Sequence, residues 1–225
     1  MAERALIVGA GPGLSAALCR RFRAEGLAVG LAARDTAKLE GLGDWRWGVD
    51  AADFASVADL FRAADDQFGV ADVVVYNPSV RLRGPTLELD PGAVKRAVEV
   101  TAYGGLLVAQ QALRRMLEAG AGTLLFTGAS ASVKGFAGSA PFAMGKFALR
   151  GLAESLAREF HPQNIHIGHV VIDGGIRAPG VAEPADAPDS LLDPDAVAEV
   201  YWQLVRQPRS AWTVEQAVRP WVERF

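Results

Sequence analysis

Short apolar runs alternate with amphipathic stretches along most of the chain. The runs have the length of strands, and the stretches between them repeat apolar residues at helical spacing. The run ADVVVYN is apolar at consecutive positions, as expected of a strand covered on both faces. Strands separated by helices predict parallel pairing with right-handed crossovers, and hence an α/β fold with a doubly wound sheet. We expect strands at residues 4–10, 27–34, 44–50, 71–77, 122–128 and 164–172 and helices at 14–26, 53–69, 93–118, 142–160 and 195–206.

One segment, RAPGVAEPADAPDSLLDP at residues 177–194, interrupts this alternation. It is rich in Pro, Ala and Asp and has no periodicity, so it is predicted to be a mobile loop. Loops of this length within a compact domain are more often functional or disordered than neutral. The chain shows no internal repeat and no interdomain linker, so we expect a single domain over residues 1–225.

Composition and charge narrow the classes of partner. A net charge of −3 gives no electrostatic reason to expect nucleic acid. The one cysteine, Cys19, excludes an intrachain disulfide and fits a reducing compartment. The apolar start lacks the pattern of a signal peptide, and no apolar run approaches the roughly 20 residues that span a bilayer. We therefore expect a cytoplasmic protein that binds neither nucleic acid nor membrane.

The glycine cluster VGAGPGLS, residues 8–15, follows the first expected strand and opens the first expected helix. Gly9, Gly11 and Gly13 would let the backbone turn sharply and approach a pyrophosphate at the helix N-terminus. The strand–turn–helix context is what makes this otherwise loose pattern informative. It predicts a dinucleotide-binding turn.

The second expected strand ends in AAR. Folds that bind NAD tend to place an acid near this point, where it accepts a hydrogen bond from the ribose 2′-hydroxyl. Arg34 is instead a cation suited to a 2′-phosphate, which favours NADP over NAD. Asp35 keeps the alternative open, because it could be the expected acid displaced by a residue or two.

Six motifs in order resemble those of the short-chain dehydrogenase/reductase family over nearly the whole chain. VGAGPGLS is similar to the family's TGxxxGxG, GVD at 48–50 to its third-strand end, and YNPS at 76–79 to its NNAG. VTAYGG, FAMGK and IDGGIR take the places of VNxxG, YxxxK and the proline-glycine turn. The resemblance implies a Rossmann-like fold with about seven strands, an NADP or NAD cofactor, a small-molecule substrate, and a homodimer or homotetramer.

The resemblance also implies roles for individual residues. Asp50 would contact the adenine, Lys146 would hold the nicotinamide ribose, and residues 177–193 would form the substrate loop. The turn that follows the sixth expected strand would cradle the nicotinamide. Together with the glycine turn and Arg34, the expected cofactor-binding residues are Gly9, Gly11, Gly13, Leu14, Arg34, Asp50, Ala51, Asn77, Lys146, Gly174 and Ile176.

The reacting centre departs from the family pattern. There a serine polarises the substrate carbonyl, a tyrosine transfers the proton, and the lysine lowers the pKa of the tyrosine. Here Phe142 stands at the tyrosine position, four residues before Lys146 and on the same helix face. Of Ser130 and Ser132, Ser130 fits the family's usual gap better. The candidate catalytic residues are therefore Ser130, Phe142 and Lys146.

A phenyl ring can neither give nor take a proton, and losing a positioned general acid typically costs about 10²–10⁴ in rate. The sequence thus leaves two functions open. One is an NAD(P)-dependent oxidoreductase of a small carbonyl or alcohol that lacks the usual proton donor. The other is a non-catalytic nucleotide-binding relative, a sensor or a partner subunit. Tyr103, His161, His166 and His169 are expected to be structural, and no cluster has metal-ligand spacing.

Overall fold

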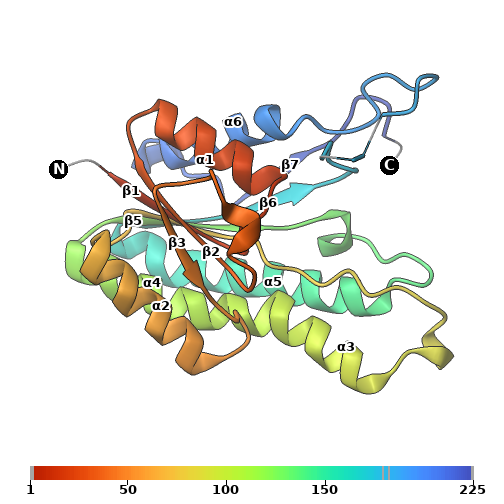
Figure 1. Ribbon diagram of the computed structural model, residues 1–225, viewed down its shortest axis with the longest axis horizontal. Coiled ribbons are helices and arrows are strands. Elements are labelled where there is room, and N and C mark those ends of the chain that lie inside the picture. The colour runs from red at the N-terminus through yellow and green to blue at the C-terminus, as the bar shows by residue number, and fades with distance from the viewer. Residues whose placement is uncertain (1–2, 179, 182, 224–225) are drawn as a thin grey trace.

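The computed structural model describes residues 3–178, 180–181 and 183–223 (Figure 1). Within them, strands pair in parallel into one sheet, in the order β3-β2-β1-β4-β5-β6-β7. This confirms the predicted Rossmann-like, doubly wound α/β fold. The strands are β1 (Arg4–Val8), β2 (Ala28–Ala33), β3 (Trp45–Gly48), β4 (Val73–Tyr76), β5 (Gly122–Thr127), β6 (Ile165–Ile172) and β7 (Glu215–Val218).

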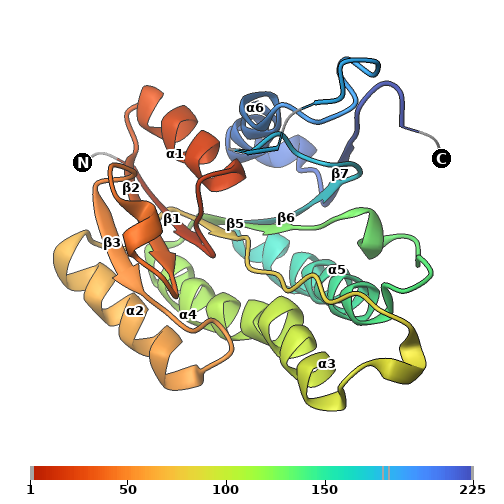
Figure 2. The ribbon, with the colours of Figure 1, turned by 45° about the vertical axis from the view of Figure 1, so that its right-hand side comes forward.

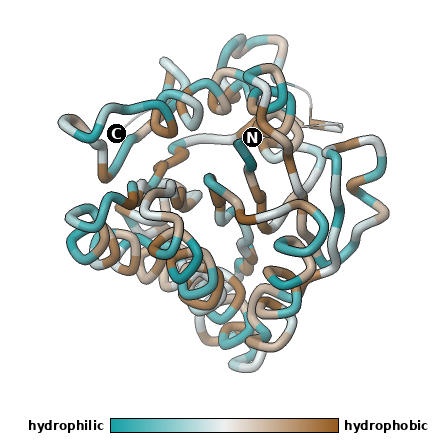
Figure 3. Tube along the Cα trace, turned by 90° about the vertical axis from the view of Figure 1, so that its left-hand side faces the viewer, coloured by the Kyte–Doolittle hydropathy of each residue, from teal (hydrophilic) through white to brown (hydrophobic). Residues whose placement is uncertain are grey.

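Helices cover both faces of the sheet, α1 and α6 on one and α2, α4 and α5 on the other (Figures 1 and 2). Each face has its own buried apolar cluster, one around Phe22 and Leu31 and the other around Phe61 and Phe126. The helices change between hydrophobic and hydrophilic residues turn by turn, as expected when one side packs on a sheet (Figure 3). Their bounds are α1 (Leu14–Ala24), α2 (Phe54–Gln67), α3 (Pro91–Val98), α4 (Gly104–Ala119), α5 (Ala140–Phe160) and α6 (Pro194–Val205).

The sheet order reverses beside β1, and this reversal positions the site. Val8, the last residue of β1, is paired with Ala32 of β2 and with Tyr76 of β4. The chain then enters α1 on one face after β1, and helices on the opposite face after β4 (Figure 2). A crevice therefore opens outside the carboxyl ends of these strands, where ligands of doubly wound sheets bind.

The helix expected at residues 93–118 differs from the structure in two ways. It begins two residues earlier, at Pro91, because the Asp90 carboxylate accepts a 2.7 Å hydrogen bond from the Ala93 amide and caps it. It is also interrupted by a π-helical turn, Glu99–Tyr103, that separates α3 from α4. Apolar periodicity continues through such a turn, so the sequence pattern did not show it.

The last strand and the long loop lie outside the alternation of strands and helices that the sequence predicted. Strand β7 lies in the tail that follows α6, which the apolar pattern left without an element. Its residues are half-buried or exposed, so they lack the apolar run of the central strands. The loop at 177–193 is pinned at its ends by isolated bridges, Ile176 to Leu192 and Ala178 to Val181. Its predicted mobility stays a prediction.

Candidate active site

Two adjoining cavities lie at the carboxyl ends of the strands. The first, which we call the Arg34 cavity, has a volume of about 280 Å³ and is lined by residues that follow β1, β2, β3 and β4. The second, the Lys146 cavity, has a volume of about 460 Å³ and is lined by residues from the loops after β4, β5 and β6 and from α5. Asn77 and Ser79 line both, so the two form one continuous site.

The glycine turn lies beneath this site. Gly9 has φ +79°, and a Cβ there would come within 2.4 Å of the Pro78 backbone nitrogen, so only glycine fits. At Gly11 and Gly13, by contrast, no atom lies within 4 Å of the place of a Cβ. Helix α1 begins at Leu14 without a side-chain cap. The open space and the uncapped amides fit a phosphate group, as the sequence predicted.

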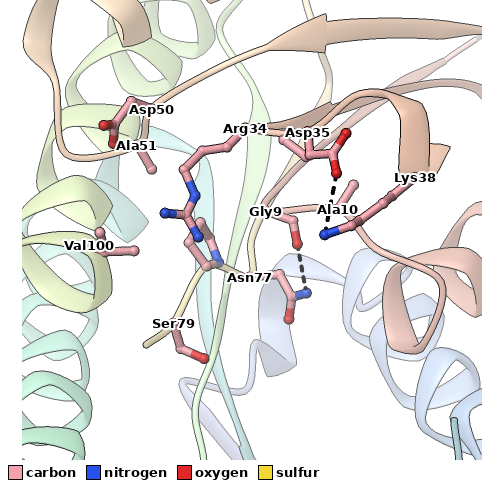
Figure 4. Close-up of a pocket in the computed structure, with 12 residues that line it drawn as sticks. Gly9, Ala10, Arg34, Asp35, Lys38, Asp50, Ala51, Asn77, Ser79 and Val100 are labelled. Atoms are coloured by element: carbon pink, nitrogen blue, oxygen red, sulfur yellow. Dashed lines mark hydrogen bonds and ion pairs between the residues drawn. The ribbon is translucent and has the colours of Figure 1, made fainter. Parts of the chain in front are cut away.

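Arg34 and Asp35 point in different directions (Figure 4). The Arg34 side chain extends into the Arg34 cavity, between Asp50 and Asn77. Asp35 turns toward Lys38, whose Nζ lies 3.3 Å from its carboxylate, and it also accepts a 3.1 Å hydrogen bond from the Ala37 amide. Both residues line the cavity, but the Arg34 side chain reaches into it, while the Asp35 carboxylate is engaged by Lys38 and the Ala37 amide.

The remaining polar groups of the Arg34 cavity are held by neighbours. Asp50 accepts hydrogen bonds from the Ala52 amide at 3.0 Å and from Arg96 at 2.5 Å. Partial burial acts to raise the pKa of Asp50, but these two bonds together with the charges of Arg96 and Arg34 hold the pKa below its usual range. Asn77 Nδ2 donates to the Gly9 carbonyl at 3.2 Å and to Ser15 Oγ at 3.0 Å, which ties the loop after β4 to the glycine turn.

Lys146 is buried on α5 with 2% of its surface exposed. Its Nζ donates a 2.6 Å hydrogen bond to the Thr127 carbonyl at the end of β5. Burial, together with the positive charge of Arg81, lowers the pKa of Lys146 to about 7. The amine can therefore exchange a proton near neutral pH, which makes it the group in this cavity best matched to acid–base chemistry.

Phe142 lies beside Lys146, and both line the Lys146 cavity, as their spacing predicted. The centre of its ring is 5.9 Å from Lys146 Nζ and 5.2 Å from Arg81 Cζ, so the ring lies within cation–π distance of both side chains. Gly174 and Ile176 face the same cavity, with Val181 and Leu191 of the long loop. The expected nicotinamide turn and substrate loop thus meet at Phe142 and Lys146.

The two candidate serines do not line this cavity. The residues that do so in the loop after β5 are Gly128 and Ala129. Ser130 begins a short 3₁₀ turn, Ser130–Ser132, and is half-buried, while Ser132 is fully buried. The role of Ser130 as the polarising group stays a prediction, and the residues that line the cavity give it no support.

Ser132 belongs to a buried network of polar side chains. Only the order of its residue types resembles a hydrolytic triad. His169 Nδ1 lies 3.0 Å from the Glu215 carboxylate, and His169 Nε2 lies 3.4 Å from Ser132 Oγ. Ser132 Oγ in turn accepts a 3.1 Å hydrogen bond from the Ala129 amide. Ser132 is 0% and His169 1% exposed, so neither can reach a substrate. This network holds the wall of the cavity in place. Burial lowers the pKa of His169.

Sequence reasoning missed two basic residues of the site. Lys38 lines the Arg34 cavity, and its position four residues after Arg34 in the same loop was an available signal. Arg81 lines the Lys146 cavity and had no signal in the sequence. Tyr103, expected to pack, is 48% exposed and lines neither cavity. His166 and His169 are buried, as expected of structural residues.

The described residues contain no group of three or more His, Cys, Asp or Glu arranged to hold a metal ion. A separate search of the described helices finds none long and apolar enough to cross a membrane.

Known proteins resemble the chain over most of its length. Residues 3–186 match the sequence profile of the short chain dehydrogenases. The cyclic-di-GMP-binding biofilm dispersal mediator protein of Escherichia coli is 33% identical over 192 residues, which are 81% of this chain and 76% of that protein.

Solved structures give the same result. A short-chain dehydrogenase from Rhodopseudomonas palustris is 34% identical, with a TM-score of 0.84 over 97% of this chain and 99% of its own. An alcohol dehydrogenase from Thermococcus sibiricus, in complex with 5-hydroxy-NADP, shares the fold at 23% identity, with a TM-score of 0.87 over 100% and 99% of the two chains. With the profile match and the architecture of the site, these likenesses show that the chain belongs to the short-chain dehydrogenase family.

Proposed function

We propose that this protein is an NADP-dependent oxidoreductase that interconverts a small carbonyl compound and its alcohol. The observation that carries the proposal is the continuity of the site from Arg34, through Asn77, to Lys146. One end presents cations and the other presents a buried amine beside an open cavity. A dinucleotide extended along the crevice would place its two ends in the two cavities.

The residues present fit NADP. Arg34 and Lys38 line one end and suit a 2′-phosphate, while the open space over Gly11 and Gly13 suits the pyrophosphate. Lys146, Gly174 and Ile176 would hold the nicotinamide half. When bound, the nicotinamide supplies hydride-transfer chemistry. The complex of the Thermococcus sibiricus relative with an NADP derivative supports the same choice of cofactor.

Lys146 would take over the proton transfer that a tyrosine performs elsewhere in the family. Phe142 fills the tyrosine position and has no exchangeable proton. Lys146 already faces the cavity, and its pKa of about 7 suits both donation and acceptance at neutral pH. Its contact with the Thr127 carbonyl engages one of its three N–H groups, which leaves donors for the ribose and the substrate oxygen.

A titration of the purified protein with NADPH and with NADH, followed by nicotinamide fluorescence, tests the cofactor. We expect saturable binding with NADPH the tighter ligand, and loss of that preference in Arg34→Gln. The matched control is Arg46→Gln, because Arg46 is exposed on β3 and lines neither cavity. Absence of binding by either nucleotide would overturn the proposal.

A second candidate is a nucleotide-binding relative without turnover, a sensor or a partner subunit. The Escherichia coli relative, a cyclic-di-GMP-binding protein, favours this second candidate. It differs from the first proposal by binding a nucleotide while leaving ketones and alcohols unchanged. Competition between cyclic di-GMP and NADPH, measured beside a turnover assay on a ketone panel, distinguishes the two.

We also propose a cytoplasmic homodimer or homotetramer. The support is an apolar groove of about 370 Å³ between α4 and α5, lined by residues such as Leu113, Leu117 and Phe160. Light scattering after size exclusion tests the assembly, with Leu117→Glu expected to reduce the mass and a monomeric wild type contradicting the proposal.

A further inference from the structure

The charges around the Lys146 cavity are all of one sign. Arg81 and Lys146 are its charged lining residues, and the rest are apolar side chains, glycines, an amide and hydroxyls. No carboxylate of the described residues lines it. Neither cation makes an ion pair with a described residue. The permanent charge of Arg81, joined by that of Lys146 whenever its amine is protonated, makes this cavity a site for an anion.

Arg81 is exposed at the rim of the cavity, and the backbone beside it is held by a buried residue. The amide of its neighbour Val80 donates a 3.2 Å hydrogen bond to Thr101 Oγ1, which is buried in the π-helical turn between α3 and α4. The guanidinium carbon lies 5.2 Å from the centre of the Phe142 ring. The Arg81 guanidinium makes no hydrogen bond or ion pair with a described residue, so its five N–H groups are available. Arg81 is thus placed beside Phe142 with its donors unused.

The acidic residues of the long loop do not oppose an anion here. Glu183, Asp186 and Asp189 do not line the Lys146 cavity. The carboxylate of Glu183 accepts a 2.9 Å hydrogen bond from the Leu191 amide, within its own loop. The loop contributes Val181 and Leu191 to the cavity wall, both apolar. A substrate would therefore meet apolar surface on this side and the two cations on the other.

We propose that Arg81 binds a carboxylate of the substrate, so that the preferred substrates are small keto acids and the corresponding hydroxy acids rather than neutral ketones and alcohols. The planar fork of an arginine matches a carboxylate with two parallel hydrogen bonds. The Phe142 ring would separate this anchoring point from the amine at which the carbonyl is reduced. The inference rests on the proposed function, because it names the substrate class of that same cavity.

The test compares acids with neutral isosteres of equal size. The probes are 2-oxobutanoate and 4-oxopentanoate, each against its primary amide, with NADPH as the reductant. In the wild type we expect a kcat/KM for one acid about 10- to 100-fold above its amide, the range for a charge-assisted hydrogen-bonded pair. Arg81→Met should abolish this preference, mainly through KM, and Arg81→Lys should restore part of it. Arg83→Met is the matched control, since Arg83 is exposed and lines neither cavity.

A calorimetric titration of each acid into the protein with NADP⁺ present separates the inference from the proposed function. Binding of an acid that Arg81→Met removes, without turnover of any probe, would support the anion site and overturn the oxidoreductase. Turnover of the amides as fast as the acids would support the oxidoreductase and overturn the inference. The inference is also overturned if no acid binds, or if Arg81→Met weakens NADPH binding as strongly as acid binding, because the arginine would then serve the cofactor.

Discussion

The Arg34 cavity and the Lys146 cavity differ in how their charged groups are compensated. In the first, Asp35 pairs with Lys38 and Asp50 with Arg96, Asn77 ties the loops together, and Arg34 is the one lining cation without an ion pair to a described residue (Figure 4). In the second, the two cations have no carboxylate partner among the described residues. Cofactor contacts can be prearranged, because the same nucleotide binds in every turnover. Burial, together with the charge of Arg81 and without a carboxylate partner among the described residues, keeps the pKa of Lys146 low, as is common for groups at reactive sites.

Removing the Lys146 amine abolishes the proton transfer proposed for the Lys146 cavity and leaves the Arg34 cavity intact. This change has the largest expected effect. In Lys146→Met we expect the rate of ketone reduction to fall by about 10³-fold, because the variant lacks a positioned acid. NADPH binding should weaken far less, since Arg34 and the glycine turn remain. Single-turnover rates and fluorescence titrations measure the two effects. Lys95→Met, at an exposed position on α3, is the control. A variant that keeps a tenth of the rate would contradict the role given to Lys146.

Adding a hydroxyl group at position 142 tests the Lys146 cavity in the opposite direction, because it adds a proton donor. Phe142→Tyr would place a phenol near Lys146 and Arg81, whose charges favour its ionised form and lower its pKa. We expect reduction to become faster by up to about 10²-fold, since the phenol would act as a general acid in addition to Lys146. Pre-steady-state rates of NADPH oxidation give the readout. An unchanged rate would mean that Lys146 already supplies the proton as fast as a tyrosine would.

Altering the first cavity should change the choice of cofactor and little else. In Arg34→Gln we expect NADPH affinity to fall by about 10- to 100-fold, because a charge-assisted contact to a phosphate is lost. NADH affinity and the maximal rate with saturating cofactor should stay within about twofold. Parallel loss of both cofactors would instead show that Arg34 supports the loop rather than the 2′-phosphate.

The smallest expected effect is a displacement of the pH profile. Reduction requires the protonated amine, so its rate should be highest below pH 7 and fall as pH rises through the Lys146 pKa of about 7. The Arg81 charge helps to lower that pKa, so Arg81→Met should move the decline to higher pH. Rates with a neutral ketone, from pH 5.5 to 9.5, isolate this shift from substrate binding. An unmoved profile would assign the decline to another group.

Local signals were sufficient for the sheet and for most of the residues that line the two cavities. The glycine turn, Arg34 and the pairing of Phe142 with Lys146 each depend on neighbouring positions along one strand, turn or helix. Cavity contacts of Asp50, Ala51, Asn77, Gly174 and Ile176 follow because each comes directly after a strand whose carboxyl end reaches the same edge. The order of strands and loops therefore carried much of the information.

What the sequence did not show depends on contacts between distant residues. Arg81 enters the cavity because Thr101, twenty residues away, holds its neighbour, and because Phe142 approaches from another helix. Ala129, rather than Ser130, faces the cavity because the turn after β5 is set by His169 and Ser132. Strand β7 carries Glu215 at an edge where packing demands no apolar run.

The buried chain from Glu215 through His169 and Ser132 to the Ala129 amide links the outermost strand to the wall of the cavity. A Cβ at Gly128 would lie 2.3 Å from His169 Nε2, so the imidazole fits here only because residue 128 is a glycine. If β7 detached from the sheet in a local unfolding event, His169 would lose the Glu215 carboxylate that orients it. Ser132 would then be released from the loop. The Ala129 amide should therefore exchange its hydrogen together with the amides that pair β6 to β7, at one shared free energy of opening.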